Sequence, residues 1–156
     1  MRMNSSKNDG VGQRQVDMAK KFHDAGLLSK QGLDAVLALR VEIYHSAGHW
    51  FLMEVVARKL WKCHPEQPIY WTTLAWAVRR LDSIKAAHSI LLDAANRFPG
   101  DAMTHFNLGC YSCQLGDIKQ AKTRDGKALE LDAKFKLLAL DGADLEPLWK
   151  EIEEAK

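Results

Sequence analysis

Cys110 and Cys113, three residues apart, are the pair in this sequence whose spacing most resembles a metal-binding or redox motif. A C-x-x-C pair supplies two thiolate ligands to a structural zinc ion, or forms a redox disulfide where it opens a helix after a strand. The only other thiol is Cys63, beside His64, and the pair lies in the segment THFNLGCYSCQLGD, which favours a helix interior. We therefore interpret both as small apolar helix residues and expect no metal or cofactor, with a metal or redox site as the alternative.

The six histidines do not form a catalytic pattern. His45 and His49 are four residues apart, but Gly48 between them predicts a turn, so the two rings need not share a helix face. The sequence contains no HExxH, no GxSxG and no glycine-rich phosphate loop. We expect a protein that is not an enzyme, with an enzyme lacking these motifs as an alternative.

The composition indicates one globular domain. The 156 residues are 47% apolar and 27% charged, and 22 basic against 20 acidic side chains leave a net charge of +2, which gives no electrostatic case for nucleic-acid binding. No apolar run approaches the ~18 residues of a membrane span, and the start of the chain lacks the apolar core of a signal peptide. Three cysteines fit poorly with a disulfide framework. We expect a cytoplasmic protein with no membrane or nucleic-acid partner.

Helical periodicity begins near Val16. Residues 1–15 have almost nothing apolar to bury and predict a disordered tail. Residues 16–33 predict an N-terminal helix or cap, with Gly26 as its terminator. Further on, Gly and Pro fall at the junctions while Ala, Leu, Lys and Arg fill the interiors, which favours helices over strands.

A period of 34 residues is the main organising feature. Shifting the chain by 34 residues superposes residues of the same kind, and five pairs coincide: Pro65 on Pro99, Leu74 on Leu108, Ala75 on Gly109, Ala87 on Ala121, and Ala94 on Ala128. Small residues at paired positions allow two antiparallel helices to approach closely. Each unit is therefore predicted to be a helical hairpin that must stack on the next.

These residues resemble the tetratricopeptide repeat, whose pattern is W-x2-L-G-x2-Y, then A-x3-F, then P. The units 68–101 and 102–135 carry the match, and 34–67 is a diverged copy. The matching residues are Trp71, Leu74, Ala75, Val78, Ala87, Leu91, Ala94 and Pro99, then Leu108, Gly109, Gly116, Asp117, Ala121, Ala128, Leu131 and Asp132. The resemblance implies an all-α solenoid of about three hairpins, 34–135, followed by a C-terminal cap, 136–156.

The last unit departs from the family pattern at three positions. His105 stands where a large aromatic residue is usual, Asp125 where Phe or Tyr is usual, and Ala133 where Pro is usual. Asp125 and the following Gly126 predict that the second helix of this unit packs less tightly or meets something polar. In the cap, Leu145, Leu148 and Trp149 are expected to cover the last hairpin.

In tetratricopeptide proteins the first helices of the hairpins line a concave groove. Carried over, the resemblance selects a wall that is mostly apolar and aromatic with two adjacent arginines, which suits an extended or helical peptide bearing apolar anchors and a carboxylate. Of the carboxylate clamp that binds chaperone tails, only Asn107 is in place, so such tails are disfavoured. The groove residues are Ile69, Thr72, Trp76, Arg79, Arg80, Met103, Phe106, Asn107, Cys110, Cys113 and Gln114, joined by Ala38, Glu42 and His45 of the diverged unit.

Two alternatives remain for this surface. Trp76 and Phe106 could be covered by the chain's own N-terminal helix or by a second subunit, because exposed aromatic patches on proteins usually mark a surface that contacts another segment or molecule. A secretion-type chaperone, similar in length and dimerising through its N-terminal helix, is the second functional hypothesis; a homodimer would follow from it.

Overall fold

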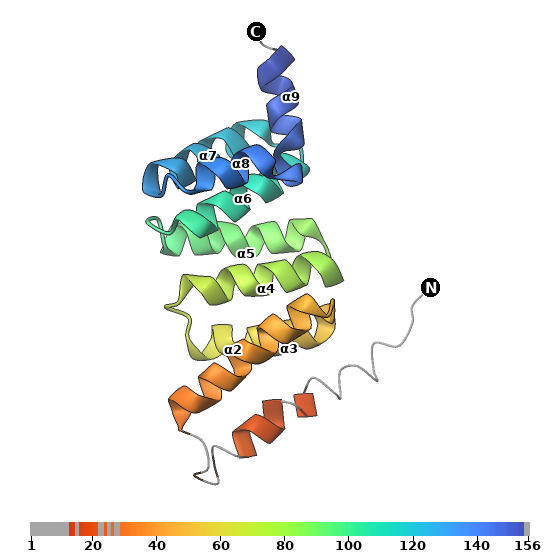
Figure 1. Cartoon of the computed structure of the whole chain (residues 1–156), viewed down its shortest axis with the longest axis vertical. Coiled ribbons are helices and arrows are strands. Elements are labelled where there is room, and N and C mark those ends of the chain that lie inside the picture. Colours follow the sequence, from red (N-terminus) through yellow and green to blue (C-terminus); the bar gives the residue numbers. More distant parts are fainter. Residues whose placement is uncertain (1–12, 15, 22–23, 25, 27–28, 155–156) are drawn as a thin grey trace, which may run out of the picture. The chain divides into compact units, whose positions relative to one another are not determined.

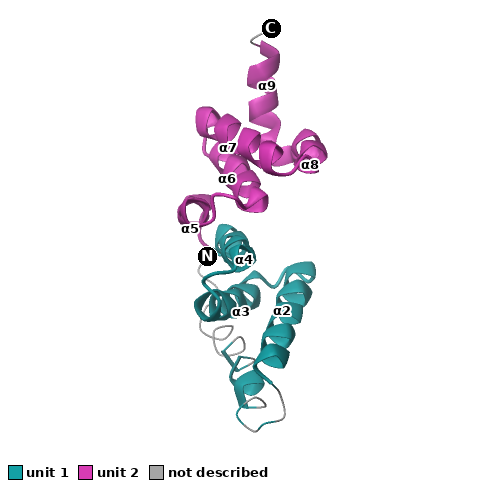
Figure 2. Ribbon diagram, turned by 90° about the vertical axis from the view of Figure 1, so that its left-hand side faces the viewer, with its two compact units in different colours: residues 1–81 teal, residues 82–156 magenta. Residues whose placement is uncertain are grey.

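The computed structural model describes residues 13–14, 16–21, 24, 26 and 29–154, and in these ranges it contains helices and turns but no strand (Figure 1). The all-α prediction is confirmed. The chain divides into two compact units, Met1–Leu81 (unit 1) and Asp82–Lys156 (unit 2), and each is described by itself (Figure 2). The predicted disordered tail lies almost wholly outside the described residues.

Unit 1 contains three long helices. They are α2 (Lys30–Ser46), α3 (Trp50–Cys63) and α4 (Pro68–Leu81), and α3 packs against both of the others. The Ser29 hydroxyl caps α2 by accepting from the backbone N–H of Gly32. Gly48, at φ +69°, makes the turn into α3, a conformation that glycine adopts without strain.

Apolar side chains at helical spacing form the core of unit 1, and each helix contributes to it. The largest fully buried members are Leu37, Met53, Val56, Leu60 and Leu74. Residues 16–21 are helical, and Val16 and Ala19 are buried.

Among its described residues, unit 2 contains five helices and a short 3₁₀ turn. They are α5 (Ile84–Arg97), α6 (Ala102–Gln114), α7 (Ile118–Leu131), α8 (Phe135–Asp141), the 3₁₀ turn η1 (Ala143–Leu145) and α9 (Glu146–Glu154). Side chains of Ser83, Asp101 and Asp117 cap α5, α6 and α7, each by accepting from a backbone N–H three residues on. Capping residues that the sequence places just before each apolar run therefore set where these helices begin.

Helix positions recur with the period seen in the sequence. Trp50, Ile84 and Ile118 begin α3, α5 and α7 at intervals of 34 residues, as Pro68 and Ala102 begin α4 and α6. The period therefore applies to the helices as well as to residue types.

One hydrogen bond recurs with the same period. Indole Nε1 of Trp71 donates to the carbonyl oxygen of Pro65 at 2.9 Å. Imidazole Nε2 of His105 lies 3.0 Å from the carbonyl oxygen of Pro99. A carbonyl only accepts, so Nε2 of His105 carries the proton. His105 thus keeps the hydrogen bond of the tryptophan that it replaces, with a smaller ring.

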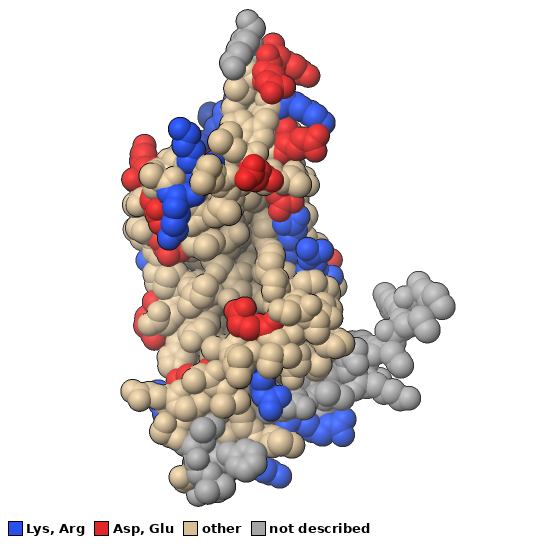
Figure 3. Space-filling model, viewed as in Figure 1, with Lys and Arg blue, Asp and Glu red and all other residues tan. Residues whose placement is uncertain are grey.

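The C-terminal segment packs on the last long helices. η1 contacts α6, and α9 contacts both α6 and α7. Leu145 and Leu148 are buried, and Trp149 donates from its indole nitrogen to the carbonyl oxygen of Ala139 at 2.9 Å. On the exposed side of α9, Lys150 forms an ion pair with Glu146 at 2.7 Å. Acidic and basic side chains lie close together on the surface near the C-terminal end (Figure 3).

Asp125 of α7 is buried against α6. Its side chain is 6% exposed, and within the described part of the chain neither carboxyl oxygen has a hydrogen-bond partner. A Cβ added to Gly109 would come within 2.8 Å of the Asp125 Cγ, so the two helices are in close contact. The expectation that this helix packs loosely or meets a polar group is therefore wrong at this position, because glycine lets α6 approach the short carboxylate side chain.

Candidate functional site

Three aromatic rings from three helices meet in unit 1. His45 comes from the last turn of α2, Trp50 opens α3, and Trp76 lies on α4. The imidazole of His45 stacks on the indole of Trp76, with ring centroids 4.2 Å apart and planes 23° apart. Trp50 meets both rings edge-on, 5.7 Å from His45 and 6.5 Å from Trp76. With Arg80, described next, these residues form what we call the aromatic cluster.

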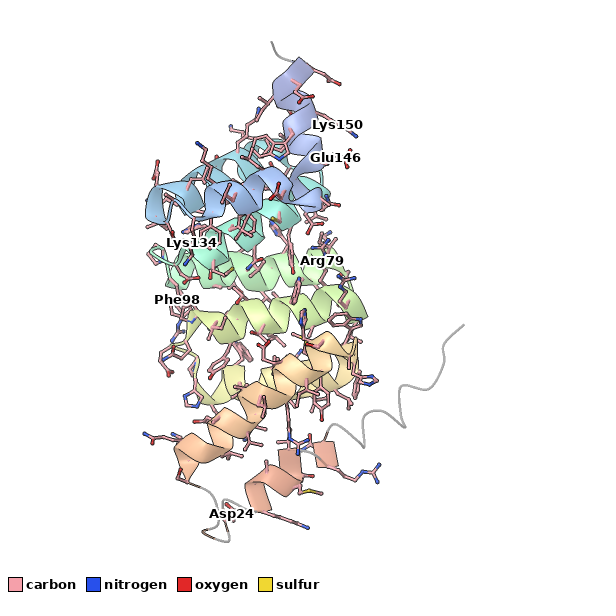
Figure 4. All side chains as sticks on the ribbon, in the orientation of Figure 1. Asp24, Arg79, Phe98, Lys134, Glu146 and Lys150 are labelled. Carbon is pink, nitrogen blue, oxygen red and sulfur yellow. The ribbon has the colours of Figure 1, made fainter. Side chains whose placement is uncertain are left out.

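A cation lies at the edge of the cluster. The guanidinium carbon of Arg80 is 5.0 Å from the centroid of the Trp50 ring, which is cation–π distance. Arg80 follows Trp76 by four residues, so both side chains lie on one face of α4. Arg79 is half-buried in the last turn of the same helix, where the helix dipole favours positive charge (Figure 4).

The cluster is open to solvent on one side. Trp76 is 36% exposed, Arg80 is exposed, and His45 and Trp50 are half-buried. The described residues of the N-terminal segment lie elsewhere: Gln13, Val16, Asp17 and Lys20 border a hollow whose other wall is formed by residues 54–62 of α3. These four residues therefore lie beside α3, while Trp76 keeps an exposed face.

Trp50 was not among the site residues predicted from the sequence. It directly follows the Gly48 turn, and as the first residue of a helix it has little periodic context to show which way it faces. Its place near His45 could have been predicted from the turn, because a tight helical hairpin brings the last turn of one helix beside the first turn of the next. His45, which was predicted from the sequence as a groove residue of the diverged unit, stacks on Trp76.

The other predicted residues of unit 1 differ in exposure. Ile69 is exposed, but Thr72 is buried, and its hydroxyl donates to the carbonyl oxygen of Ile69 at 2.9 Å. Because this hydroxyl is buried and already donates within its own helix, Thr72 presents no free polar group to a partner. Ala38 is half-buried and Glu42 is exposed on α2.

In unit 2 the predicted residues on α6 are divided. Met103 is exposed, Asn107 is half-buried, and the ring of Phe106 lies 5.2 Å from that of Phe135. Gln114 is exposed and donates to the backbone carbonyl of Asp144 at 2.7 Å, so it helps to attach the C-terminal segment.

Cys110 and Cys113 are buried, which corrects the expectation that they line an open groove. Cys113 is 2% exposed, and burial raises the pKa of its thiol. The physical reason is tertiary: η1 and α9 fold onto α6, a packing that helix periodicity alone does not reveal. Both are free thiols, as is the exposed Cys63.

None of the described helices is long and apolar enough to cross a bilayer. No protein-family model matches the chain, and comparison with curated proteins finds no significant match.

Proposed function

We propose that the protein is a non-catalytic protein-binding module built from hairpins of the tetratricopeptide type. The proposal is supported by the 34-residue recurrence of helix starts and of the Trp71–Pro65 and His105–Pro99 hydrogen bonds. Such hairpins present helix surfaces to partners and need no catalytic group. The three free cysteines agree with a cytoplasmic setting for this module.

The aromatic cluster carries the proposal. Tryptophan and arginine are the residues that most often dominate binding energy at interfaces, and here both are solvent-accessible and already ordered by ring contacts. Preordered side chains lose little conformational entropy when a partner binds. The cluster therefore has the chemistry of a binding site rather than of a closed core.

The partner that fits is a peptide segment with an apolar or aromatic side chain close to a carboxylate. The apolar side chain would pack on the exposed face of Trp76, and the carboxylate would meet the guanidinium of Arg80. Because Arg80 already lies over Trp50, a bound carboxylate would be held at the edge of an apolar surface, where water screens the charge less. In unit 2, Met103 and Asn107 of α6 remain proposed partner contacts.

A peptide-display selection tests the proposal directly. The wild-type chain and the variants Trp76→Ala and Arg80→Gln are panned against the same random library. Leu138→Ala is the matched control, since Leu138 is also an exposed apolar residue, 50% exposed, but lies on α8 of unit 2.

We expect wild type and Leu138→Ala to enrich the same motif, an apolar residue near Asp or Glu. Trp76→Ala should lose the motif, and Arg80→Gln should keep its apolar part but lose the acidic preference. If the selected peptides are indifferent to both Trp76 and Arg80, the aromatic cluster is not the binding site.

A further inference from the structure

Unit 2 contains a hollow of about 700 Å³ between α5, α6 and α7 that is broadly open to solvent and shares no residue with the aromatic cluster; we call it the cavity. This volume lies in the range of small-molecule sites. Its walls include three cations, Lys122, Arg124 and Lys127, and one acid, Glu130, among apolar and neutral polar residues. The walls are formed by Ala95, Asn96, Pro99, His105, Lys122, Thr123, Arg124, Gly126, Lys127 and Glu130.

The internal repeat explains why there is space here. One period earlier, unit 1 has Trp61 and Trp71, which pack edge to face with ring centroids 5.3 Å apart. The corresponding residues of unit 2 are Ala95 and His105, both in the cavity wall. Two indoles have been replaced by a methyl group and an imidazole, while the hydrogen bond to Pro99 is kept. The cavity therefore occupies a position that large aromatic side chains fill in the other unit.

The cations of α7 are also particular to this site. Lys122, Arg124 and Lys127 line the cavity, whereas the residues one period earlier are His88, Ile90 and Asp93. A stretch with one acid and no lysine or arginine has thus become a stretch with three permanent cations.

Arg124 is held by a ring nitrogen of His105 and has no acidic partner among the described residues. Its Nη1 lies 3.4 Å from Nδ1 of His105, which accepts because the other ring nitrogen donates to Pro99. No carboxylate among the described residues pairs with this guanidinium, and most of its five N–H donors remain available. A guanidinium held by a neutral ring in a cavity wall lacks its counter-charge.

The neighbouring charges leave room for an anion. Lys122 is paired with Glu151 at 2.8 Å. Lys127 lies 3.5 Å from Glu130, which is longer than the roughly 2.7–2.9 Å of a well-formed charged pair. Lys127 can therefore turn to a ligand in the cavity. Asn96 and Thr123 add neutral hydrogen-bonding groups.

We propose that this cavity binds a small phosphate monoester of about sugar-phosphate size, its phosphate held by Arg124 and Lys127. The planar guanidinium matches two phosphate oxygens at once, and the lysine adds a second charge. The cavity is far larger than a bare phosphate ion, so the organic part of the ester occupies the remainder, within reach of Asn96 and Thr123.

Amide NMR titration with ribose 5-phosphate tests this, with ribose and inorganic phosphate as separate arms. We expect saturable shifts confined to residues at the cavity for the ester, with inorganic phosphate at least about tenfold weaker and ribose without effect. Arg124→Met should weaken ester binding by about tenfold or more, since a charge-assisted hydrogen bond is lost. Lys119→Met, a change of an exposed lysine on α7 outside the cavity, should change it less than about twofold.

A second variant tests the cavity without removing a cation. His105→Trp restores the residue of the other unit, which keeps the Pro99 hydrogen bond and fills the space, so it should abolish binding while circular dichroism shows a folded chain. The proposal is overturned if ribose binds as well as its phosphate, if inorganic phosphate binds equally tightly, or if Arg124→Met binds the ester like wild type.

Discussion

Asp125 should make the protein less stable as the pH rises. Its carboxyl group is buried against Gly109 without a hydrogen-bond partner among the described residues, and burial raises its pKa from 3.8 to about 7. In the unfolded chain the group returns to its ordinary pKa. Between about pH 4 and pH 7 the folded state therefore binds more protons than the unfolded state, and unfolding free energy falls as pH rises.

The size of the effect follows from the shift. A difference of about three pKa units, at about 1.36 kcal/mol each, gives a penalty on the order of 4 kcal/mol. The penalty is complete above pH 7, where both states are ionised, and it is absent well below pH 4, where both are protonated. This is a large fraction of the stability of a small domain.

The test compares wild type with Asp125→Asn, which keeps the shape of the side chain and removes the charge. At pH 8 the variant should be more stable by about 4 kcal/mol, and at pH 4 the difference should fall below about 1 kcal/mol, because the wild-type carboxyl is then protonated. Urea unfolding followed by far-ultraviolet circular dichroism measures both values. Hydrogen exchange of α7 amides assigns the change to unit 2.

Two further variants control the result. Asp93→Asn, an exposed carboxylate on α5, should change stability by less than about 0.5 kcal/mol at either pH. Asp125→Leu introduces the residue found one period earlier, the buried Leu91, and should also remove the pH dependence. An Asn advantage that is equal at pH 4 and pH 8, or a carboxyl pKa near 4 by NMR titration, would refute the reasoning.

Three other outcomes follow from burial. In the native protein Cys63 should react with a bulky alkylating reagent, while Cys110 and Cys113 should resist it until urea is added. Mass spectrometry of the labelled peptides measures the labelling at each cysteine. Equal labelling of all three would contradict the packing of η1 and α9 on α6. Trp149→Ala should lower the unfolding free energy by about 3 kcal/mol, since a half-buried indole and one hydrogen bond are lost, and a loss below about 1 kcal/mol would mean that α9 does not dock. Gly109→Ala should cost roughly 1–3 kcal/mol because the new methyl group meets the carboxyl group of α7, so an unchanged urea midpoint would show that the helices can separate there.

Helix positions were the most predictable part of the fold. The small residues and glycines of the 34-residue pattern, together with capping residues such as Asp117, mark helix ends through local physics that needs no tertiary information. The turn at Gly116 and the start of α7 at Ile118 follow directly from this. The unit to which each helix belongs does not follow from these signals, because it depends on tertiary packing between helices, which capping and turn residues do not determine.

The candidate site was predictable only where helical spacing determines direction. Trp76 and Arg80 are four residues apart on one helix, so their shared face could be inferred, and the structure places both in the aromatic cluster. The burial of Cys110 and Cys113 could not be inferred in this way. It depends on where a C-terminal segment more than thirty residues further along the chain folds back, and helix periodicity carries no such information.

The two departures from the repeat pattern in α6 and α7 have different physical consequences. At His105 a smaller ring preserves the backbone hydrogen bond of Trp71, so the structural role is kept while space and a guanidinium become available beside it. At Asp125 a charged group replaces a buried apolar one and nothing in the described residues compensates it, so stability is lost at neutral pH. A substitution that opens a lined cavity at little structural cost has the character of a binding site, whereas an uncompensated buried charge alters only the conditions under which unit 2 stays folded.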